Sequence, residues 1–335
     1  MPIITCNSGS SNTKLALFDG TNLNRIEDLQ THRKLEATVW LQSASKKNIT
    51  AIGHRVVHGG DKFTAPVIIT PQIIKELEEF IPLAPLHQPA ALELIAEAIK
   101  LYPDIPHIAC FDTGFHHTMP EIERMFALPK KYYDSGIKRY GFHGLSYEYI
   151  ASVLPENLGN KASGKIIVAH LGGGASACAL KNLQSIATSM GFSTLDGLMM
   201  GTRPGTLDAG VIMHLIEHKK MTLDEINHLL YKESGLLGVS GVSSDMRELL
   251  ASDEQVAHNA IELYCYIAAK QIAALLPTIG GLDALVFTGG IGEHAKPVRE
   301  KICSHLKWLG DFVVYAIATD EEIVIAKACE RLNKN

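Results

Sequence analysis

Residues 3–18 read IITCNSGSSNTKLALF, and residues 166–180 read IIVAHLGGGASACAL. Each stretch joins two short apolar runs through a turn of small residues, which is the pattern of a β-hairpin. Two such hairpins, about half a chain apart, favour a duplicated domain with a cleft between the halves. Because hairpins with glycine turns are common, chance repetition is the alternative. No low-complexity linker separates the halves, so we expect a tight hinge.

Outward from these hairpins, strand-length apolar runs alternate with longer helical patterns, which predicts an α/β protein. The expected strands cover residues 3–6, 15–18, 52–57, 107–111, 166–170, 175–180 and 284–288. The expected helices cover residues 89–101, 222–231, 256–276 and 321–332. Pro89 suits the first turn of its helix, and Pro277 is expected to end the helix that precedes it.

The composition is that of an ordinary globular protein. The 335 residues can form two cores, with 46% hydrophobic and 20% charged residues. The formal net charge is −5 and no run of Lys or Arg occurs, which argues against nucleic-acid binding. A local cationic pocket for a small anion stays possible.

The cysteine spacing and the apolar stretches indicate in which cellular compartment the protein is located. The six cysteines are scattered without a CxxC pair, which favours reduced core residues over a disulfide framework or a zinc site. The N-terminus has no basic region of a signal peptide. The most apolar long stretch, residues 257–276, contains Glu262 and Lys270, which disfavours a membrane span. We therefore expect a soluble, cytoplasmic protein.

Three turns rich in small residues could hold phosphate groups. The first, NSGSSNTK at residues 7–14, offers backbone N–H groups, hydroxyls and the charge of Lys14. It lacks P-loop spacing, and a strand rather than a helix is expected to follow. Gly172–Gly174 and GGIGE at residues 289–293 are the other two. Each alone is most simply a polar turn, but the three together fit a bound nucleotide.

Two arginines stand in glycine-bounded segments. Arg55 lies in GHRVVHGG at residues 53–60, and Arg203 lies in GTRPG at residues 201–205. A guanidinium fork in such a place can bind a carboxylate or phosphate, although a surface salt bridge is the simpler reading of each arginine alone. His54 and His58 could be taken as a metal pair, but no acidic or thiol ligand lies at suitable spacing.

Asp112 and His143 complete the candidate residues that the pattern itself suggests. Asp112 follows the expected strand 107–111, where an acid often faces a ligand crevice, although a turn cap is an equal alternative. His143 stands between glycines in YGFHG, where a histidine is more often structural than catalytic.

Taken together, these segments resemble the acetate kinase family. The strings that carry the resemblance are NSGSSNTK, GHRVVHGG, LAPLHQP, FDTGFHHTMP, RYGFHG, SMGFSTLDGLMMGTRPG, GLLGVSGVSSDMRE, FTGGIGEH and TDEE, which occur in family order between residues 3 and about 326. The resemblance implies two related lobes of the ribonuclease H-like/actin-like ATPase fold around a central nucleotide cleft. It places residues 1–116 plus 323–335 in one lobe and 117–322 in the other. It also implies a homodimer, ATP and ADP as co-substrates, Mg²⁺ (replaceable by Mn²⁺), and a role in acetyl-CoA biosynthesis.

The resemblance also assigns roles to residues. It implies catalytic roles for Arg55, Asp112, His143 and Arg203, and a carboxylate pocket of Arg55, Val57, Leu86, Phe142 and Thr194. It implies nucleotide or phosphate binding by Ser10, Lys14, His170, Gly172, Gly174, Asp245, Arg247, Gly290, Ile291 and Gly292. It implies that Asn7 and Glu321, with Asp112, organise Mg²⁺ through water.

Elementary chemistry supports this assignment. A carboxylate nucleophile is already ionised at pH 7, so the reaction needs no general base. The obstacle is the approach of two anions, since two unit charges 4 Å apart repel by about 4 kcal/mol at an effective dielectric constant near 20. Two arginines, a histidine and Mg²⁺ would overcome this repulsion by positioning the reactants and neutralising their charge. A sugar kinase would instead need an Asp to accept a hydroxyl proton.

The sequence departs from the family pattern at several points. Asn12, Gly173, Ala175, Thr194, Met246 and His294 replace the usual Ser, Asn, Ser, Pro, Phe and Asn, respectively. The chain is also shorter than typical members, chiefly at 14–53 and 308–319. These departures leave open a propionate or butyrate kinase, a pyrophosphate-dependent member, and a catalytically weakened nucleotide-binding protein. The charged set of Arg55, Asp112, His143, Arg203 and Glu321 favours an active carboxylate kinase that uses acetate.

Overall fold

The two predicted hairpins form the centres of two separate β-sheets. Strands β1 (Ile3–Ser8) and β2 (Thr13–Phe18) pair antiparallel, with Ser8 opposite Thr13 at the turn. Strands β7 (Ile166–Leu171) and β8 (Ala175–Lys181) pair in the same way, with Leu171 opposite Ala175. A strand does follow the first turn, as predicted, so this turn is not a P-loop.

The computed structural model describes residues 2–9, 12–20, 22–85 and 87–334. The chain divides into two units, which are described separately below. Unit 1 comprises Met1–His117, Phe142–Tyr149 and Asp320–Asn335, and unit 2 comprises Thr118–Gly141 and Ile150–Thr319. The division expected from the sequence placed residues 142–149 with the other lobe, whereas their contacts group them with unit 1.

The two sheets share one topology. The strand order is β3-β2-β1-β4-β6-β5 in unit 1 and β11-β10-β7-β8-β9 in unit 2. In each sheet the hairpin is extended by a third antiparallel strand on one side and by two parallel strands on the other. Apart from β5, an additional antiparallel edge strand in unit 1, the equal order and direction confirm the two related lobes that the repeated hairpin predicts.

Seven of these strands match the predicted runs within two residues. The remaining strands of the predicted set are β4 (Ala51–Val56), β6 (His107–Phe111) and β10 (Ala284–Thr288). Four further strands were not predicted, namely β3 (Arg25–Thr31), β5 (Val67–Ile68), β9 (Gln184–Thr188) and β11 (Val313–Ala316). β3 and β11 are mostly exposed and β5 has two residues, so none of these three has the long apolar run that marks a central strand.

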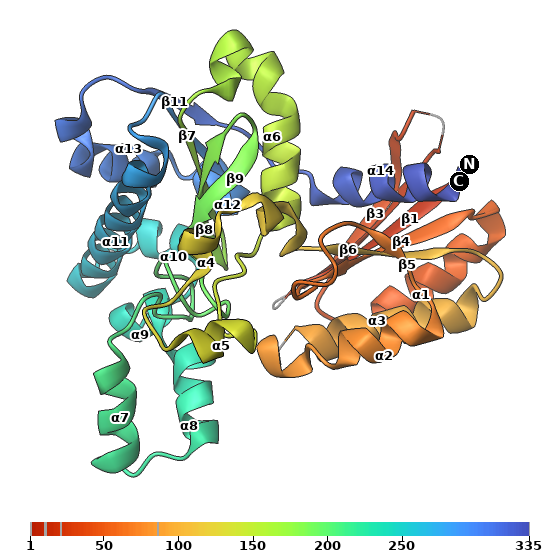
Figure 1. The fold of residues 1–335 in the computed structure, drawn as a ribbon, viewed down its shortest axis with the longest axis horizontal. Coiled ribbons are helices and arrows are strands. Elements are labelled where there is room, and N and C mark those ends of the chain that lie inside the picture. The colour runs from red at the N-terminus through yellow and green to blue at the C-terminus, as the bar shows by residue number, and fades with distance from the viewer. Residues whose placement is uncertain (1, 10–11, 21, 86, 335) are drawn as a thin grey trace. The chain divides into compact units, whose positions relative to one another are not determined.

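Helices cover both faces of the sheet of unit 1. These helices are α1 (Lys34–Ala44), α2 (Pro71–Glu78), α3 (Gln88–Leu101) and α14 (Glu321–Asn333). α2 and α3 lie on one face of the sheet and α14 lies on the other (Figure 1). Thr70 caps α2 by accepting a hydrogen bond from the backbone N–H of Ile73.

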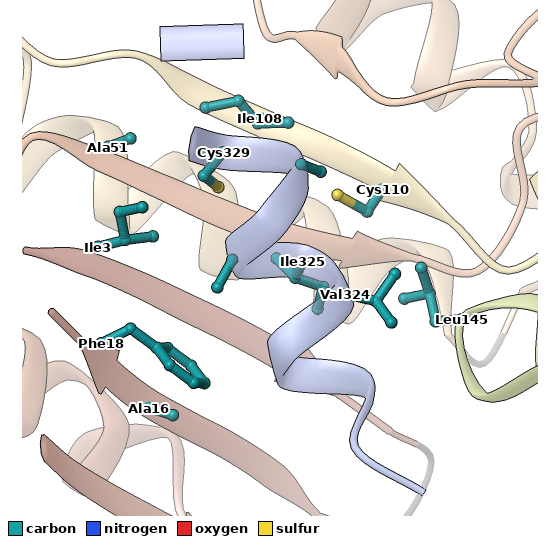
Figure 2. Close-up of a cluster of buried hydrophobic side chains, with 12 residues drawn as sticks. Ile3, Ala16, Phe18, Ala51, Ile108, Cys110, Leu145, Val324, Ile325 and Cys329 are labelled. Atoms are coloured by element: carbon teal, nitrogen blue, oxygen red, sulfur yellow. The ribbon is translucent and has the colours of Figure 1, made fainter. Parts of the chain in front are cut away.

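α14 packs closely on the centre of this sheet. Ile325 and Cys329 of α14 lie over Ile3, Ala51 and Ile108 of the strands (Figure 2). A Cβ at position 53 would approach Ile325 Cγ2 to 2.3 Å and Cys329 Sγ to 2.6 Å. Gly53 of β4 therefore permits this close approach, and the N-terminal end of α14 is fixed beside the ends of β1 and β4.

Unit 2 carries the remaining helices, and α11 and α13 lie together in it (Figure 1). Its helices are α4 (Glu121–Arg124), α5 (Lys130–Asp134), α7 (Ala209–Glu217), α8 (Leu223–His228), α9 (Gly235–Ser240), α10 (Met246–Ala251), α11 (Gln255–Ile279), α12 (Gly289–His294) and α13 (Lys296–His305). Helix α6 (Gly144–Leu158) begins in unit 1 and continues into unit 2.

Two predicted helix boundaries were wrong. Pro277 does not end α11, which continues to Ile279 and stops at Gly280, where φ is +74°. Pro277 removes the one hydrogen bond that its own N–H would have donated, but its fixed φ is compatible with a helix, so the helix continues past it. The expected helix at 222–231 is α8, capped by Thr222 and Glu225, followed by a π-helical turn, η5 (Leu229–Glu233).

The structure also gives the burial of the cysteines and the length and apolar character of the helices. All six cysteines are free, and all except Cys303 are buried. The burial of the other five agrees with the prediction that they are core residues. Across residues 2–334, leaving out the gaps given above, no helix has the length and apolar character needed to cross a membrane.

Candidate active site

A buried ion pair between Arg55 and Asp112 is the centre of the candidate site in unit 1. Arg55 lies on β4, and Asp112 comes directly after the neighbouring parallel strand β6. Arg55 Nε donates to both carboxylate oxygens of Asp112, at 3.0 and 3.1 Å, and Arg55 Nη2 donates to Oδ2 at 2.5 Å. The pair is thus a two-nitrogen fork on one carboxylate and not a surface salt bridge.

Asn7 connects this pair to the first residues of α14. Arg55 Nη1 donates to Asn7 Oδ1 and to the carbonyl of Ser8, both at 3.3 Å. Asn7 Nδ2 donates to Glu321 Oε2 at 2.8 Å and to Glu322 Oε1 at 2.9 Å. The predicted residues Asn7, Arg55 and Glu321 therefore belong to one polar cluster, which we call the unit 1 cluster together with Asp112 and Glu322.

The charges of the unit 1 cluster depend on one another. Burial alone would lower the pKa of Arg55, but the carboxylates of Asp112, Glu321 and Glu322 raise it above its ordinary value, so Arg55 stays protonated. Burial raises the pKa of Asp112, an effect that Arg55 opposes and Glu321 increases. The carboxylates of Asp112, Glu321 and Glu322 share the guanidinium of Arg55, and Lys14 and Arg25 add positive charge beside Glu322.

The segment 142–149 completes the surroundings of Asp112. The backbone N–H of Gly144 donates to the carbonyl of Asp112 at 2.9 Å, and the backbone of His143 is hydrogen-bonded to the Asp112 carboxylate. A Cβ at position 144 would lie 2.0 Å from that carbonyl oxygen, so only glycine fits. His143 itself has φ of +58°, a left-handed conformation that a non-glycine residue rarely adopts. Strain of this kind is common at functional positions.

Apolar and aromatic residues lie beside the unit 1 cluster. Val57 and Phe142 are buried, and the ring of Phe142 packs edge-on against His58, which stacks on Phe80. Burial lowers the pKa of His58 to about 4, so this ring is neutral at pH 7. The structure thus places Phe142 against His58, which follows the buried Val57 in the chain, while Leu86 lies outside the described residues.

His116 holds the backbone of Phe142. Its Nε2 lies 2.9 Å from the carbonyl oxygen of Phe142, and since a carbonyl only accepts, this nitrogen carries the proton. Burial lowers the pKa of His116 to about 4. Nothing in the sequence marked His116 apart from its neighbour His117, because the partner carbonyl lies 26 residues away.

Lys14 lies at the edge of the unit 1 cluster. Its Nζ is 3.9 Å from Glu322 Oε1, and its side chain is about half exposed. Arg25 on β3 also contacts α14, at 2.7 Å from Asp320 and 3.6 Å from Glu322. Ser10, the other residue predicted for this turn, lies outside the described residues.

The oxygen atoms of the unit 1 cluster can be compared with the ligands that Mg²⁺ prefers. Asp112, Glu321, Glu322 and the Asn7 carbonyl oxygen are hard donors of the kind that Mg²⁺ prefers. Within the described part of the chain, no three His, Cys, Asp or Glu side chains are placed to hold a metal by themselves. The set therefore fits Mg²⁺ that keeps several waters and takes phosphate oxygens, as it does in kinases. His54 and His58 do not form a metal pair, because His54 instead contacts His107 at 3.0 Å.

In unit 2, the glycine-rich turns predicted for the nucleotide converge. The turn after β7 is closed by a hydrogen bond from Gly172 N–H to the Gly174 carbonyl at 2.9 Å. A Cβ on Gly172 would lie 3.8 Å from His170 Nε2 and 4.0 Å from the backbone nitrogen of Gly290. Gly292 follows in α12 and packs against the end of β10 and β7. The turn after β7 and the start of α12, which also contains Ile291, are therefore neighbours.

The loop of residues 200–203 contacts the glycine-rich turn after β7. Gly201 N–H donates to the Gly173 carbonyl at 3.3 Å, and a Cβ on Gly201 would lie 3.3 Å from the carbonyl of Ser244. Asp245 and Arg247, just after Ser244, pair with each other, since Arg247 Nη2 donates to Asp245 Oδ2 at 2.5 Å. Asp245 and Arg247, both predicted for nucleotide binding, are therefore mutual partners at the start of α10.

Arg203 is buried at the end of this loop. Its Nη1 donates to the carbonyl of Thr194 at 2.7 Å, and Thr194 is itself buried. The structure thus places the predicted residues Arg203 and Thr194 in contact.

Comparison with known proteins gives consistent results. The sequence pattern of the acetokinase family matches residues 30–328. An acetate kinase of Rhodopseudomonas palustris is 50% identical over 317 residues, covering 88% of this chain and 80% of the relative. The crystal structure of Porphyromonas gingivalis acetate kinase superposes with a TM-score of 0.87 at 34% identity, covering 99% of both chains. A propionate kinase from Francisella tularensis gives 0.89 at 33% identity, covering 98% of this chain and 99% of that one.

The buried, neutral His116 predicts a pH dependence of stability. Its pKa is about 4 when folded against an ordinary value of 6.5, so the unfolded chain binds the extra proton between these pH values. Stability from this group is complete above pH 6.5 and falls as the pH drops toward 4, by about 3 kcal/mol. In His116→Gln the amide still donates to Phe142, but the titration is gone. The free energy of unfolding in urea should therefore fall less steeply with acid in the variant.

The exposed His258 provides the control for this measurement. His258→Gln makes the same chemical change at the surface and should give a profile parallel to that of the parent. If His116→Gln were also parallel to the parent between pH 6.5 and 4, His116 would not be the buried neutral group that the structure indicates.

Proposed function

The chain belongs to the acetokinase family, and we infer that it transfers a phosphoryl group reversibly between ATP and acetate, giving ADP and acetyl phosphate. The observation that carries this inference is the largely buried fork of Arg55 on Asp112, which is bonded in turn to the backbone of His143, directly after the buried Phe142. A cationic fork next to a small apolar wall suits a short carboxylate, whose charge and methyl group need these two surroundings.

Arg55 is proposed to bind the carboxylate and the migrating phosphoryl group. Asp112 fixes the guanidinium through Nε and Nη2, so no reorganisation is needed when the substrate arrives. Arg55 Nη1 makes longer hydrogen bonds, at 3.3 Å, to Asn7 and Ser8, and an anionic substrate can replace these bonds. Because acetate is already ionised at pH 7, these residues need not remove a proton. Their contribution is charge neutralisation and positioning.

Arg203 and His143 are proposed to stabilise the charge that develops during transfer. Arg203 is held by the Thr194 carbonyl, and His143 is held in its left-handed conformation next to Asp112. The turns around Gly172–Gly174 and Gly290–Gly292, with His170, Ile291, Lys14, Asp245 and Arg247, are proposed to bind ATP.

Mg²⁺ is proposed as the cofactor, with Asn7, Asp112 and Glu321 as the residues that organise its water ligands. When bound, Mg²⁺ would supply positive charge to the phosphate oxygens of the nucleotide. The carboxylates of the unit 1 cluster would orient the waters, and Asn7 would keep Glu321 in place.

Propionate is the second candidate substrate. Thr194 stands where the family resemblance leads us to expect a proline in the acyl pocket, and a similar solved structure is named as a propionate kinase. The first arm of the experiment below therefore compares carboxylates of increasing length.

A homodimer is also proposed, through the exposed apolar side chains of α7. This helix has the sequence AGVIMHLIE, and none of its residues is buried. Val211, Met213 and Ile216 are exposed on it. A helix of this composition normally buries one face, so a second copy of the chain is the proposed cover. The cytoplasmic location and the role in acetyl-CoA biosynthesis stay predictions.

The function is tested by trapping acyl phosphate as the hydroxamate, with Mg·ATP and acetate, propionate or butyrate. We expect product with the parent and a loss of at least about 100-fold in kcat for Arg203→Ala and for Arg55→Ala, since each removes a buried cation from the reacting charge. Arg33→Ala, at an exposed arginine, is the matched control and should keep the parent rate. Parent-like rates in both buried variants would remove the proposed mechanism.

The metal role is tested by titrating Mg²⁺ at constant ATP. Glu321→Gln keeps the size of the side chain but removes its charge, so the Mg²⁺ concentration for half-maximal velocity should rise about tenfold. Glu156→Gln, at an exposed position of α6, should give the parent curve. Superimposable titrations of the parent and Glu321→Gln would exclude Glu321 from the metal site.

The proposed dimer is tested by sedimentation. The parent should sediment with twice the 36.5 kDa of one chain, and Met213→Glu should sediment as a monomer because it places charge among the exposed apolar side chains of α7. Lys219→Glu, an exposed change just after α7, should remain dimeric. A parent that is monomeric, or a Met213→Glu variant that stays dimeric, would contradict an interface at α7.

A further inference from the structure

Gln88 is a fully buried polar residue at the start of α3, with 0% of its surface exposed. Its side-chain amide makes three hydrogen bonds. Oε1 accepts from the backbone N–H of His58 at 3.3 Å, and Nε2 donates to the carbonyls of His58 and Leu77 at 3.2 and 3.1 Å. Because a buried polar group that loses its partner is costly, these bonds keep His58 and the end of α2 beside the start of α3.

The amide of Gln88 holds both peptide groups that flank His58. The N–H of His58 belongs to the peptide group that follows Val57, and the carbonyl of His58 belongs to the peptide group that precedes Gly59. One amide can bind both, because it carries an acceptor oxygen and a donor nitrogen in one rigid plane. The backbone just after Val57 is therefore fixed against α3.

The ring of His58 connects this restraint to Phe142. His58 Nδ1 accepts a hydrogen bond from the backbone N–H of Gly60 at 2.9 Å, which fixes the ring relative to its own backbone. The ring centroids of His58 and Phe142 lie 5.7 Å apart in an edge-on arrangement, and Phe80 stacks on His58, also at 5.7 Å. His58 and Phe142 are both buried. Since close-packed rings do not shift independently, the position of Phe142 depends on Gln88 through His58.

We propose that Gln88 is a positioning residue that holds His58, and through it Phe142, and thereby limits the length of the acyl chain that the enzyme accepts. The proposal rests on the proposed function, which assigns Phe142 to the carboxylate pocket. It assigns no contact between Gln88 and the substrate. When the bonds of Gln88 are lost, the ring of Phe142 gains freedom to move, and a longer carboxylate fits more easily.

The test uses Gln88→Met, which nearly keeps the size of the side chain and removes all three hydrogen bonds. The ratio of kcat/KM for propionate to that for acetate should rise about three- to tenfold, a part of the roughly 10- to 200-fold that one methylene is worth. The KM for ATP should change less than twofold, because the three bonds go to residues outside those proposed for ATP. A parent-like ratio in Gln88→Met would overturn the proposal.

Two further variants control this measurement. Gln72→Met makes the same change at an exposed glutamine of α2 and should keep the parent ratio. Gln88→Glu keeps the size of the side chain and the acceptor for the His58 N–H, so its ratio should lie between those of the parent and Gln88→Met. If Gln88→Met does not fold, a parent-like ratio in Gln88→Glu overturns the proposal. A lowered Tm with an unchanged ratio would show a merely structural role and overturn it as well.

A double-mutant cycle tests whether Gln88 acts through Phe142. Phe142→Leu removes the ring that His58 contacts. In that background, adding Gln88→Met should change the ratio by less than about twofold, because the two residues act on the same wall of the pocket. If the two changes instead multiplied fully, Gln88 would act by another route, and the proposal would be overturned.

Failure of the proposed function would be distinguishable from failure of this inference. If the parent forms no acyl phosphate with any carboxylate, the proposed function fails, and the positioning is read from amide hydrogen exchange, which needs no substrate. Gln88→Met should then exchange at least about threefold faster than the parent at residues 142–147, with α1 unchanged as the internal control. Equal exchange at 142–147 in the parent and the variant, or equal acceleration there and in α1, overturns the positioning role.

Discussion

The buried contact between Arg55 and Asp112 is the constraint on which the site in unit 1 depends. A guanidinium without a partner in such a place would cost several kcal/mol, so the ends of β4 and β6 must stay adjacent. The backbone of Asp112 is used as well, by Gly144, and its carboxylate by His143. Asn7 links the pair to α14. One ion pair thereby ties together five segments of the chain.

Much of this fold could be predicted from the sequence. The two hairpins predicted the repeated sheet topology, because central strands bury continuous apolar runs and turns need small residues. The strands β3 and β11 were not predictable in this way, since their side chains are mostly exposed. Helix ends depend on single residues, and at α11 the left-handed Gly280 decided the boundary although Pro277 precedes it.

The candidate site also contains residues that could be predicted from the sequence and residues that could not. Arg55, Asp112, Asn7 and Glu321 could be named from motifs, and the structure brings these four together. The residues that hold them in place could not, because their roles are set by contacts across the chain. Glu322 and His116 are such residues, bonded to the Asn7 side chain and to the backbone of Phe142, respectively. A motif contains the residues that contact the ligand, whereas the residues that hold them in place depend on the local packing.

The last helix of the chain has a consequence for the synthesis of the protein. The strands of the first sheet are complete by residue 111, but the face under α14 is covered only when residues 321–333 have been made (Figure 2). On the ribosome, that apolar face therefore stays open through most of translation, and a chaperone is the natural cover for it. A premature stop codon shortly before residue 321 would not yield a slightly shorter enzyme. It would yield a chain with an uncovered core and a buried arginine that lacks two of its neighbouring carboxylates.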